Sequence, residues 1–249
     1  MAPPGDEAEY TGPFNTAFDQ IREGAQKAVD AFNDLVAKVN RWAWLIGPAA
    51  LWWIKHNLDA IRDALDKVLE KVRYAIEHQL PVLSLISISF RWVGEVKTPV
   101  SELSFAATEP ADEDLVKWTG DAAAAYTRKS TQQKAAIDES VLKAEFISQW
   151  LFKIAKANVD FAAELAKIVT GLANKIVEAA AEAGGVITLP LVIETLGNSV
   201  GTLVEEGLNI LITVGQRFVD ALGNVRDLAT QVGDHSKLPG GNWPQAVRG

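Results

Sequence analysis

The sequence predicts an all-α protein, an elongated helical bundle built on a long antiparallel helical hairpin. Three observations lead to this expectation. A run of about 63 residues, Asp121 to Ala183, contains no proline. Apolar residues recur at spacings of three and four along several segments, which is the period of one face of a helix. No part of the chain alternates strand and helix patterns as α/β proteins do.

Composition limits both the size of the core and the class of partner. With 249 residues, 48% of them hydrophobic, the chain can bury a real core as one elongated domain or two small ones. Its net charge is -8 and it has no basic cluster, which argues against a nucleic-acid partner. It has no cysteine, so disulfides, thiolate metal sites and cysteine nucleophiles are excluded.

The first residues do not resemble a cleavable signal peptide. Residues 1–9 lack the basic and apolar regions of a signal peptide, which disfavours the general secretory route. No uncharged apolar run reaches the roughly 18 residues of a spanning helix, so constitutive membrane insertion is disfavoured as well. The acidic chain would be repelled by an anionic membrane surface, although a local apolar patch could override that repulsion.

Residues 1–81 form the first predicted segment, two helices joined by a tryptophan-rich turn. The first helix is expected over about 14–41. Pro48 suits the first turn of the second helix, which Pro81 ends. The apolar stripes are Phe14, Phe18, Ile21, Ala25, Ala28, Phe32, Leu35 and Val39 in the first helix, and Leu58, Ile61, Leu65, Val68, Val72 and Ile76 in the second.

Four of the eight tryptophans lie around the turn between these helices, at Trp42, Trp44, Trp52 and Trp53. Tryptophan favours the membrane–water boundary, so the cluster could be an interfacial anchor. It also lies between two amphipathic helices that need covering. We therefore favour a core role for it.

Residues 82–183 form the second segment, in which a hairpin is expected. Serines and β-branched residues leave 82–108 open between a short strand and an irregular helix, and Pro99 prevents one uninterrupted helix. Proline and acidic residues predict a short helix from about Pro110 to Lys117. After Gly120, Asp121 is placed as the N-cap of the long helix.

The long helix is expected to run over Asp121–Ala183, which would approach roughly 95 Å if unbroken. Gly171 and Asn158 are its weak points, and Asn158 could fix register against a partner helix. Its apolar seam is Ile137, Val141, Ala144, Ile147, Leu151, Ile154, Asn158, Phe161, Leu165, Ile168, Leu172 and Ile176.

The C-terminal part divides into residues 184–235 and a tail, 236–249. Glycines dilute the apolar residues after Gly184-Gly185, and two helices that pack on the hairpin are expected at about 190–205 and 206–232. The tail is rich in proline and glycine around Trp243 and should be extended.

The run from Leu115 to Tyr126, which includes Trp118-Thr119-Gly120 and four alanines, resembles the WxG superfamily. These are the ESAT-like helical hairpins of type VII secretion systems. Residues Trp92, Pro99-Val100, Leu103 and Gln132-Gln133 also resemble its larger, actinobacterial-type members, and the likeness covers about residues 85–180. The resemblance implies that Trp118 and Gly120 hold the bend between two antiparallel helices, with Tyr126 beside it. The WxG turn would then lie at one end of the hairpin.

Two features depart from the family pattern. Exported members carry a tyrosine followed four residues later by an acid, whereas Tyr10, Tyr74 and Tyr126 are followed by Phe14, His78 and Ser130. The arm before the turn is also interrupted by prolines. An ordinary helical bundle, in which Trp-Thr-Gly is a simple helix–helix turn, is the competing interpretation.

Other residues that could take part in catalysis or metal binding do not form the pattern of an active site. Gly197 to Gly201 matches the G-x-S-x-G nucleophile elbow, but Ser199 lacks the preceding strand, and His235 is the only downstream histidine. His56 and His78 are isolated and are expected at the surface or at helix ends. Glu205 and Glu206 are adjacent and point to different helix faces, so they form no acid–base pair. No enzyme activity, cofactor or metal is expected.

The resemblance implies a non-enzymatic type VII secretion-associated protein, a substrate or partner-binding module acting through helix–helix interaction. Expected partners are the secretion machinery, a small WxG-type protein or a second copy, with recognition by the long helix and Trp243 in the tail. The protein would be secreted without a cleavable signal, or otherwise cytoplasmic. The alternative is an α-helical pore-forming or membrane-interacting protein that exposes residues 186–214.

Overall fold

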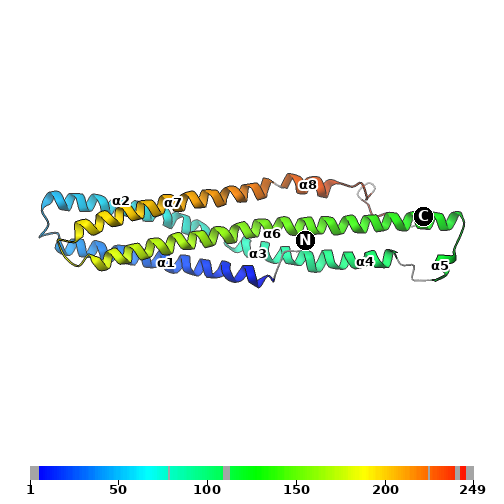
Figure 1. The fold of residues 1–249 in the computed structure, drawn as a ribbon, viewed down its shortest axis with the longest axis horizontal. Helices are drawn as coiled ribbons and strands as arrows, with labels where there is room; N and C mark the ends of the chain where they lie inside the picture. Colours follow the sequence, from blue (N-terminus) through cyan, green and yellow to red (C-terminus); the bar gives the residue numbers. More distant parts are fainter. Residues whose placement is uncertain (1–5, 78, 109–112, 224, 239–241, 245–249) are drawn as a thin grey trace. The chain divides into compact units, whose positions relative to one another are not determined.

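The computed structural model describes residues 6–77, 79–108, 113–223, 225–238 and 242–244, and over these residues the chain is all-α without a strand. The elements appear in Figure 1. They are α1 (Ala8–Trp42), α2 (Pro48–Glu77), α3 (Gln79–Arg91), a π-helical turn η1 (Trp92–Lys97), α4 (Thr98–Thr108), α5 (Glu113–Lys117), α6 (Asp121–Glu182), α7 (Leu189–Gly223) and α8 (Val225–Gly233).

The chain forms two compact units, each assembled from stretches that are far apart in sequence. Unit 1 comprises Met1–Glu7, Leu83–Lys156 and Val219–Gly249, and unit 2 comprises Ala8–Val82 and Ala157–Phe218. Helix α6 contributes residues to both. These boundaries differ from those of the four sequence segments, because tertiary contacts rather than composition define them.

Unit 2 is a four-helix arrangement of α1, α2, the C-terminal part of α6 and α7. In α1, Lys27 Nζ donates to Asn174 Oδ1 at 3.1 Å, and Lys38 Nζ donates to the carbonyl of Ala180 at 2.6 Å. From the first bond to the second, the residue number rises in both helices, from 27 to 38 in α1 and from 174 to 180 in α6, so the two helices are parallel. Each is followed by an antiparallel partner, α2 and α7, across a short connection.

The core of unit 2 follows the predicted stripes. The twelve largest fully buried side chains include Phe14, Ile21, Leu35 and Val39 of α1, Ile54 and Ile61 of α2, and Leu165, Leu172 and Ile176 of α6. Helix α2 begins at Pro48 as predicted, and the N–H of Leu51 donates to the carbonyl of Gly47 at 2.9 Å. Helix α1 begins at Ala8 rather than near residue 14, with Pro13 inside its early turns.

The prediction of two helices at 190–205 and 206–232 is wrong. Helix α7 runs unbroken from Leu189 to Gly223, and α8 is a separate short helix. The glycines that suggested breaks include a packing position. A Cβ built on Gly207 would lie 2.9 Å from the Ile168 side chain, so this glycine lets α7 approach α6 closely.

The sequence left residues 82–108 open between a short strand and an irregular helix, and the structure shows the irregular helix. The π-helical turn η1 precedes Pro99, and the N–H of Thr98 donates to the carbonyl of Val93, five residues back. Thr98 Oγ1 also donates to this carbonyl, at 2.9 Å. Since proline has no N–H and its ring crowds the preceding turn, a local widening of the helix accommodates it.

In unit 1, α3 and α4 run antiparallel to the N-terminal part of α6. Ser148 Oγ donates to the carbonyl of Ser89 at 2.8 Å, and Ser104 Oγ donates to Asp138 Oδ1 at 3.1 Å. From the first bond to the second, the residue number rises from 89 to 104 in the first arm and falls from 148 to 138 in α6, so the two arms are antiparallel. Ser89 and Ser148 are the two buried polar residues of the described core, and each hydroxyl makes a hydrogen bond.

Charged groups add to this antiparallel pairing. Lys97 Nζ lies 2.9 Å from Glu145 Oε2 across the two arms. Hydrogen bonds from Lys134 and, more weakly, from Ser104 lower the pKa of Asp138 against the opposing effect of burial. Asp138 is still half-exposed, so it contributes more to register than to stability.

Helix α6 runs without a break from Asp121 to Glu182, through both Asn158 and Gly171. Every predicted seam residue on it is buried or half-buried.

Helix α5 begins at Glu113, and the predicted start at Pro110 lies outside the described residues. The tail prediction is wrong for its first residues, since the Leu238 N–H donates to the His235 carbonyl at 2.9 Å and closes a turn.

Candidate functional site

The turn between α5 and α6 is built by Trp118, Thr119 and Gly120. Gly120 has a φ of +98°, the one positive φ among the described residues. Its carbonyl accepts the N–H of Ala124 at 3.1 Å, the first hydrogen bond of α6. Gly120 therefore occupies the N-cap position. The assignment of Asp121 as N-cap is wrong, because Asp121 is the first residue of the helix itself.

We expect Gly120→Ala to lower the free energy of unfolding by about 1 kcal/mol, because L-residues are strained at positive φ. A Cβ at this position would meet nothing within 4 Å, so the cost comes from the backbone alone. Urea denaturation would measure the change. Gly94→Ala is a matched control, since its Cβ also meets nothing and its φ is not positive. Equal effects of the two substitutions would contradict the assigned strain.

An aromatic pair extends from this turn onto α6. The rings of Trp118 and Tyr126 have centroids 5.9 Å apart and are tilted by 51°. Trp118 is 44% exposed and Tyr126 is 46% exposed, so the pair presents an apolar surface to solvent. Such contact distances are those of an interacting aromatic pair.

A shallow groove of about 370 Å³ lies beside the aromatic pair. Its other lining residues are Ala122, Ala125, Arg128, Lys129 and Gln132. The small alanine side chains leave the rings uncovered, and the two cations give the groove a positive edge. Sequence reasoning included the aromatic residues, the alanines and Gln132 in the WxG-like motif but missed Arg128 and Lys129. Spacings of three and four along α6, counted from Ala122 and Ala125, place both cations near this face.

The other two predicted binding residues lie in different places. Trp243 is 48% exposed, next to Pro244, whose carbonyl accepts a hydrogen bond from Gln133 Nε2 at 3.2 Å. This hydrogen bond joins Pro244 to α6 within unit 1. Asn158 is half-buried on α6, near the start of the part that belongs to unit 2. The structure does not bring Asn158 into the groove beside Trp118.

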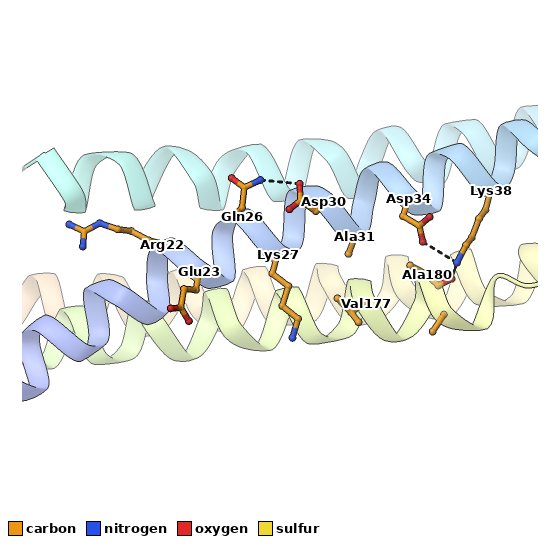
Figure 2. Close-up of a pocket in the computed structure, with 11 residues that line it drawn as sticks. Arg22, Glu23, Gln26, Lys27, Asp30, Ala31, Asp34, Lys38, Val177 and Ala180 are labelled. Atoms are coloured by element: carbon orange, nitrogen blue, oxygen red, sulfur yellow. Dashed lines mark hydrogen bonds and ion pairs between the residues drawn. The ribbon is translucent and has the colours of Figure 1, made fainter.

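A larger groove of about 880 Å³ runs between α1 and α6 in unit 2 (Figure 2). Polar and charged side chains pair along α1, with Gln26 Nε2 donating to Asp30 at 2.9 Å and Lys38 lying 3.0 Å from Asp34. Its apolar lining includes Ala31. Such pairs at helical spacing are typical of a solvated helix face.

Two of the residues weighed for catalysis, Ser199 and His56, lie on different helices. Ser199 lies inside α7, whereas a nucleophile elbow needs a strand before it. His56 is exposed and stacks on Trp52 with ring centroids 5.6 Å apart, while His78 lies outside the described residues. No cluster of metal-ligating side chains occurs in the described part of the chain.

The core interpretation of the tryptophan cluster is wrong for two of its members. Trp44 is 79% exposed and Trp52 is 68% exposed, while Trp42 and Trp53 are half-buried. The buried stripe of α2 begins only at Ile54, so the cluster extends beyond the packed layers of unit 2. Exposed tryptophans of this kind are a surface feature that needs a functional explanation.

Comparison with known proteins found no match to a protein-family description, to a curated protein or to a solved structure. A search of the described helices found none with the length and apolar character needed to cross a membrane.

Proposed function

We propose that this chain is a non-enzymatic protein associated with type VII secretion, a substrate or partner-binding module that acts through helix–helix interaction. The observation that carries the proposal is the turn at Trp118-Thr119-Gly120. A glycine at positive φ there precedes the long helix α6. The resemblance to the WxG superfamily implies that Trp118 and Gly120 lie in the bend between two antiparallel helices. The antiparallel arms within unit 1 support the same hairpin.

The groove beside Trp118 suits an amphipathic partner helix. Trp118 and Tyr126 offer aromatic surface, Ala122 and Ala125 allow close approach, and Arg128 and Lys129 favour acidic residues on the partner. A small WxG-type protein or a component of the secretion machinery would supply such a helix. The tail around Trp243 would add contact surface on the same unit.

Capture from a host with a type VII secretion system would test this proposal. The tagged full chain should retain a secretion component or a small WxG-type protein, and Trp118→Ser should weaken that binding roughly 30-fold, the effect of losing a 2 kcal/mol anchor. Leu142→Ser is the matched control, because Leu142 is also exposed and belongs to unit 1 but does not line the groove. Circular dichroism would verify that both variants fold.

Two results would remove the proposal. One is capture of no such protein by the full chain. The other is identical capture from a host whose secretion ATPase and WxG-type genes have been deleted.

Pore formation by residues 186–214 is the alternative function. It requires α7 to leave the core of unit 2, because the apolar side chains Val192, Ile193, Leu196, Val200 and Val204 are buried there. Exposing them to solvent would cost about 1.5–3 kcal/mol for each large side chain. We therefore prefer partner binding as the function.

A further inference from the structure

One end of unit 2 carries both of its helix–helix connections. Residues 43–47 join α1 to α2, and residues 183–188 join α6 to α7. The contact of Lys38 with Ala180 places the ends of α1 and α6 together. We call residues 43–53 and 183–193 the bundle tip; Figure 1 shows both connections at the same end of these helices.

The bundle tip exposes large apolar side chains from both connections. Ile187 is 94% exposed, and Trp44, Trp52 and Leu191 are each more than half exposed. Single exposed apolar residues are normal on a soluble protein, but a group of them at one end of a helical unit marks an interaction surface. These side chains extend beyond the packed core, so solvent covers them in the isolated chain.

The bundle tip carries no charge. Residues 43–53 and 183–193 contain no ionisable side chain, in a chain whose net charge is -8. On the α1–α2 side the nearest charged residues, Arg41 and Lys55, are both basic, and both are exposed. On the α6–α7 side the exposed acids Glu182 and Glu194 flank the uncharged stretch.

We propose that the bundle tip docks into the interfacial region of a zwitterionic lipid bilayer. Tryptophan side chains partition to this boundary, and an uncharged tip can enter it without desolvating an ionised group. The charges of Arg41, Lys55, Glu182 and Glu194 around the tip cancel, and the net charge of -8 opposes binding to an anionic surface. Docking leaves the core of α7 in place, and it uses residues other than Trp118 and its groove.

Vesicle flotation of the full chain tests this proposal. The protein should float with pure phosphatidylcholine vesicles, and less with vesicles containing about one third phosphatidylserine, which repel a chain of net charge -8. The double variant Trp44→Ser/Trp52→Ser should reduce the partition coefficient about tenfold or more. Ile187→Asp, which places a charge in the tip, should reduce it similarly.

Matched controls separate the bundle tip from general apolar adhesion. Tyr74→Ser and Ile212→Ser remove exposed side chains from other parts of unit 2, and both should float as the unmodified protein does. The inference is overturned if the unmodified protein stays with the soluble fraction or if the tip variants float equally well. Release of a trapped dye would instead indicate that α7 opens. Tip-dependent oligomers without vesicle binding would assign the surface to a second copy.

Discussion

Leu165→Ala should lower the free energy of unfolding by about 3–4 kcal/mol, the cost of deleting a fully buried leucine side chain. Leu165 is 0% exposed and lies at the centre of unit 2, on the part of α6 that faces both α2 and α7. It already borders a small void of about 10 Å³ beside Val68 and Val204. The helices on either side are long and mutually packed, so they cannot collapse fully around the missing atoms.

Urea denaturation followed by circular dichroism would measure this loss. Leu142→Ala removes the same atoms from the same helix, but Leu142 is 62% exposed, and its effect should stay within about 0.5 kcal/mol. A loss below about 1 kcal/mol for Leu165→Ala would contradict the close packing of α2, α6 and α7 at this level of the unit.

The helices with strong apolar periodicity could be predicted from the sequence because their stripes need a core. Phe14, Ile21 and Leu35 of α1 lie on one face at helical spacing, and all three are buried. The start of α2 at Pro48 was equally predictable, since a proline suits the first turn of a helix better than its interior. The length of α6 followed from the absence of proline over residues 121–183.

Burial at the ends of the helices could not be predicted, because it depends on where the neighbouring helices stop. Trp44 and Trp52 are large and apolar, as core residues are, yet the packed layers begin only at Ile54. Periodicity assigns a face to each residue but does not say how far along the helix that face is covered. The exposed bundle tip is therefore visible only in the structure.

The candidate site was predictable in part for a related reason. The motif located Trp118 and Gly120 at a turn, because glycine permits backbone conformations that are closed to other residues. The groove needed the structure, since Arg128 and Lys129 resemble ordinary solvated residues until their position beside the exposed rings is known. The α7 glycines were misread because local propensity cannot distinguish a break from a close helix contact.

Gly207→Val should destabilise the protein by about 2–3 kcal/mol, although glycine is normally the poorer helix residue. A Cβ at position 207 would lie 2.9 Å from both Cδ1 and Cγ1 of Ile168 and 3.0 Å from its Cγ2. Ile168 is buried and β-branched, so its side chain cannot rotate away from three contacts together. A Cβ at Gly201, which is exposed on the same helix, meets nothing within 4 Å, so Gly201→Val should be neutral or slightly stabilising.

Shortening the opposing side chain tests the cause. In the double variant Gly207→Val/Ile168→Ala, the new methyl groups occupy space that the isoleucine vacated, so the two losses should not add. We expect a coupling energy of about 2 kcal/mol in the double-mutant cycle, measured by urea denaturation. Simple additivity, or equal effects of valine at positions 201 and 207, would mean that α7 does not depend on Gly207 for its approach to α6.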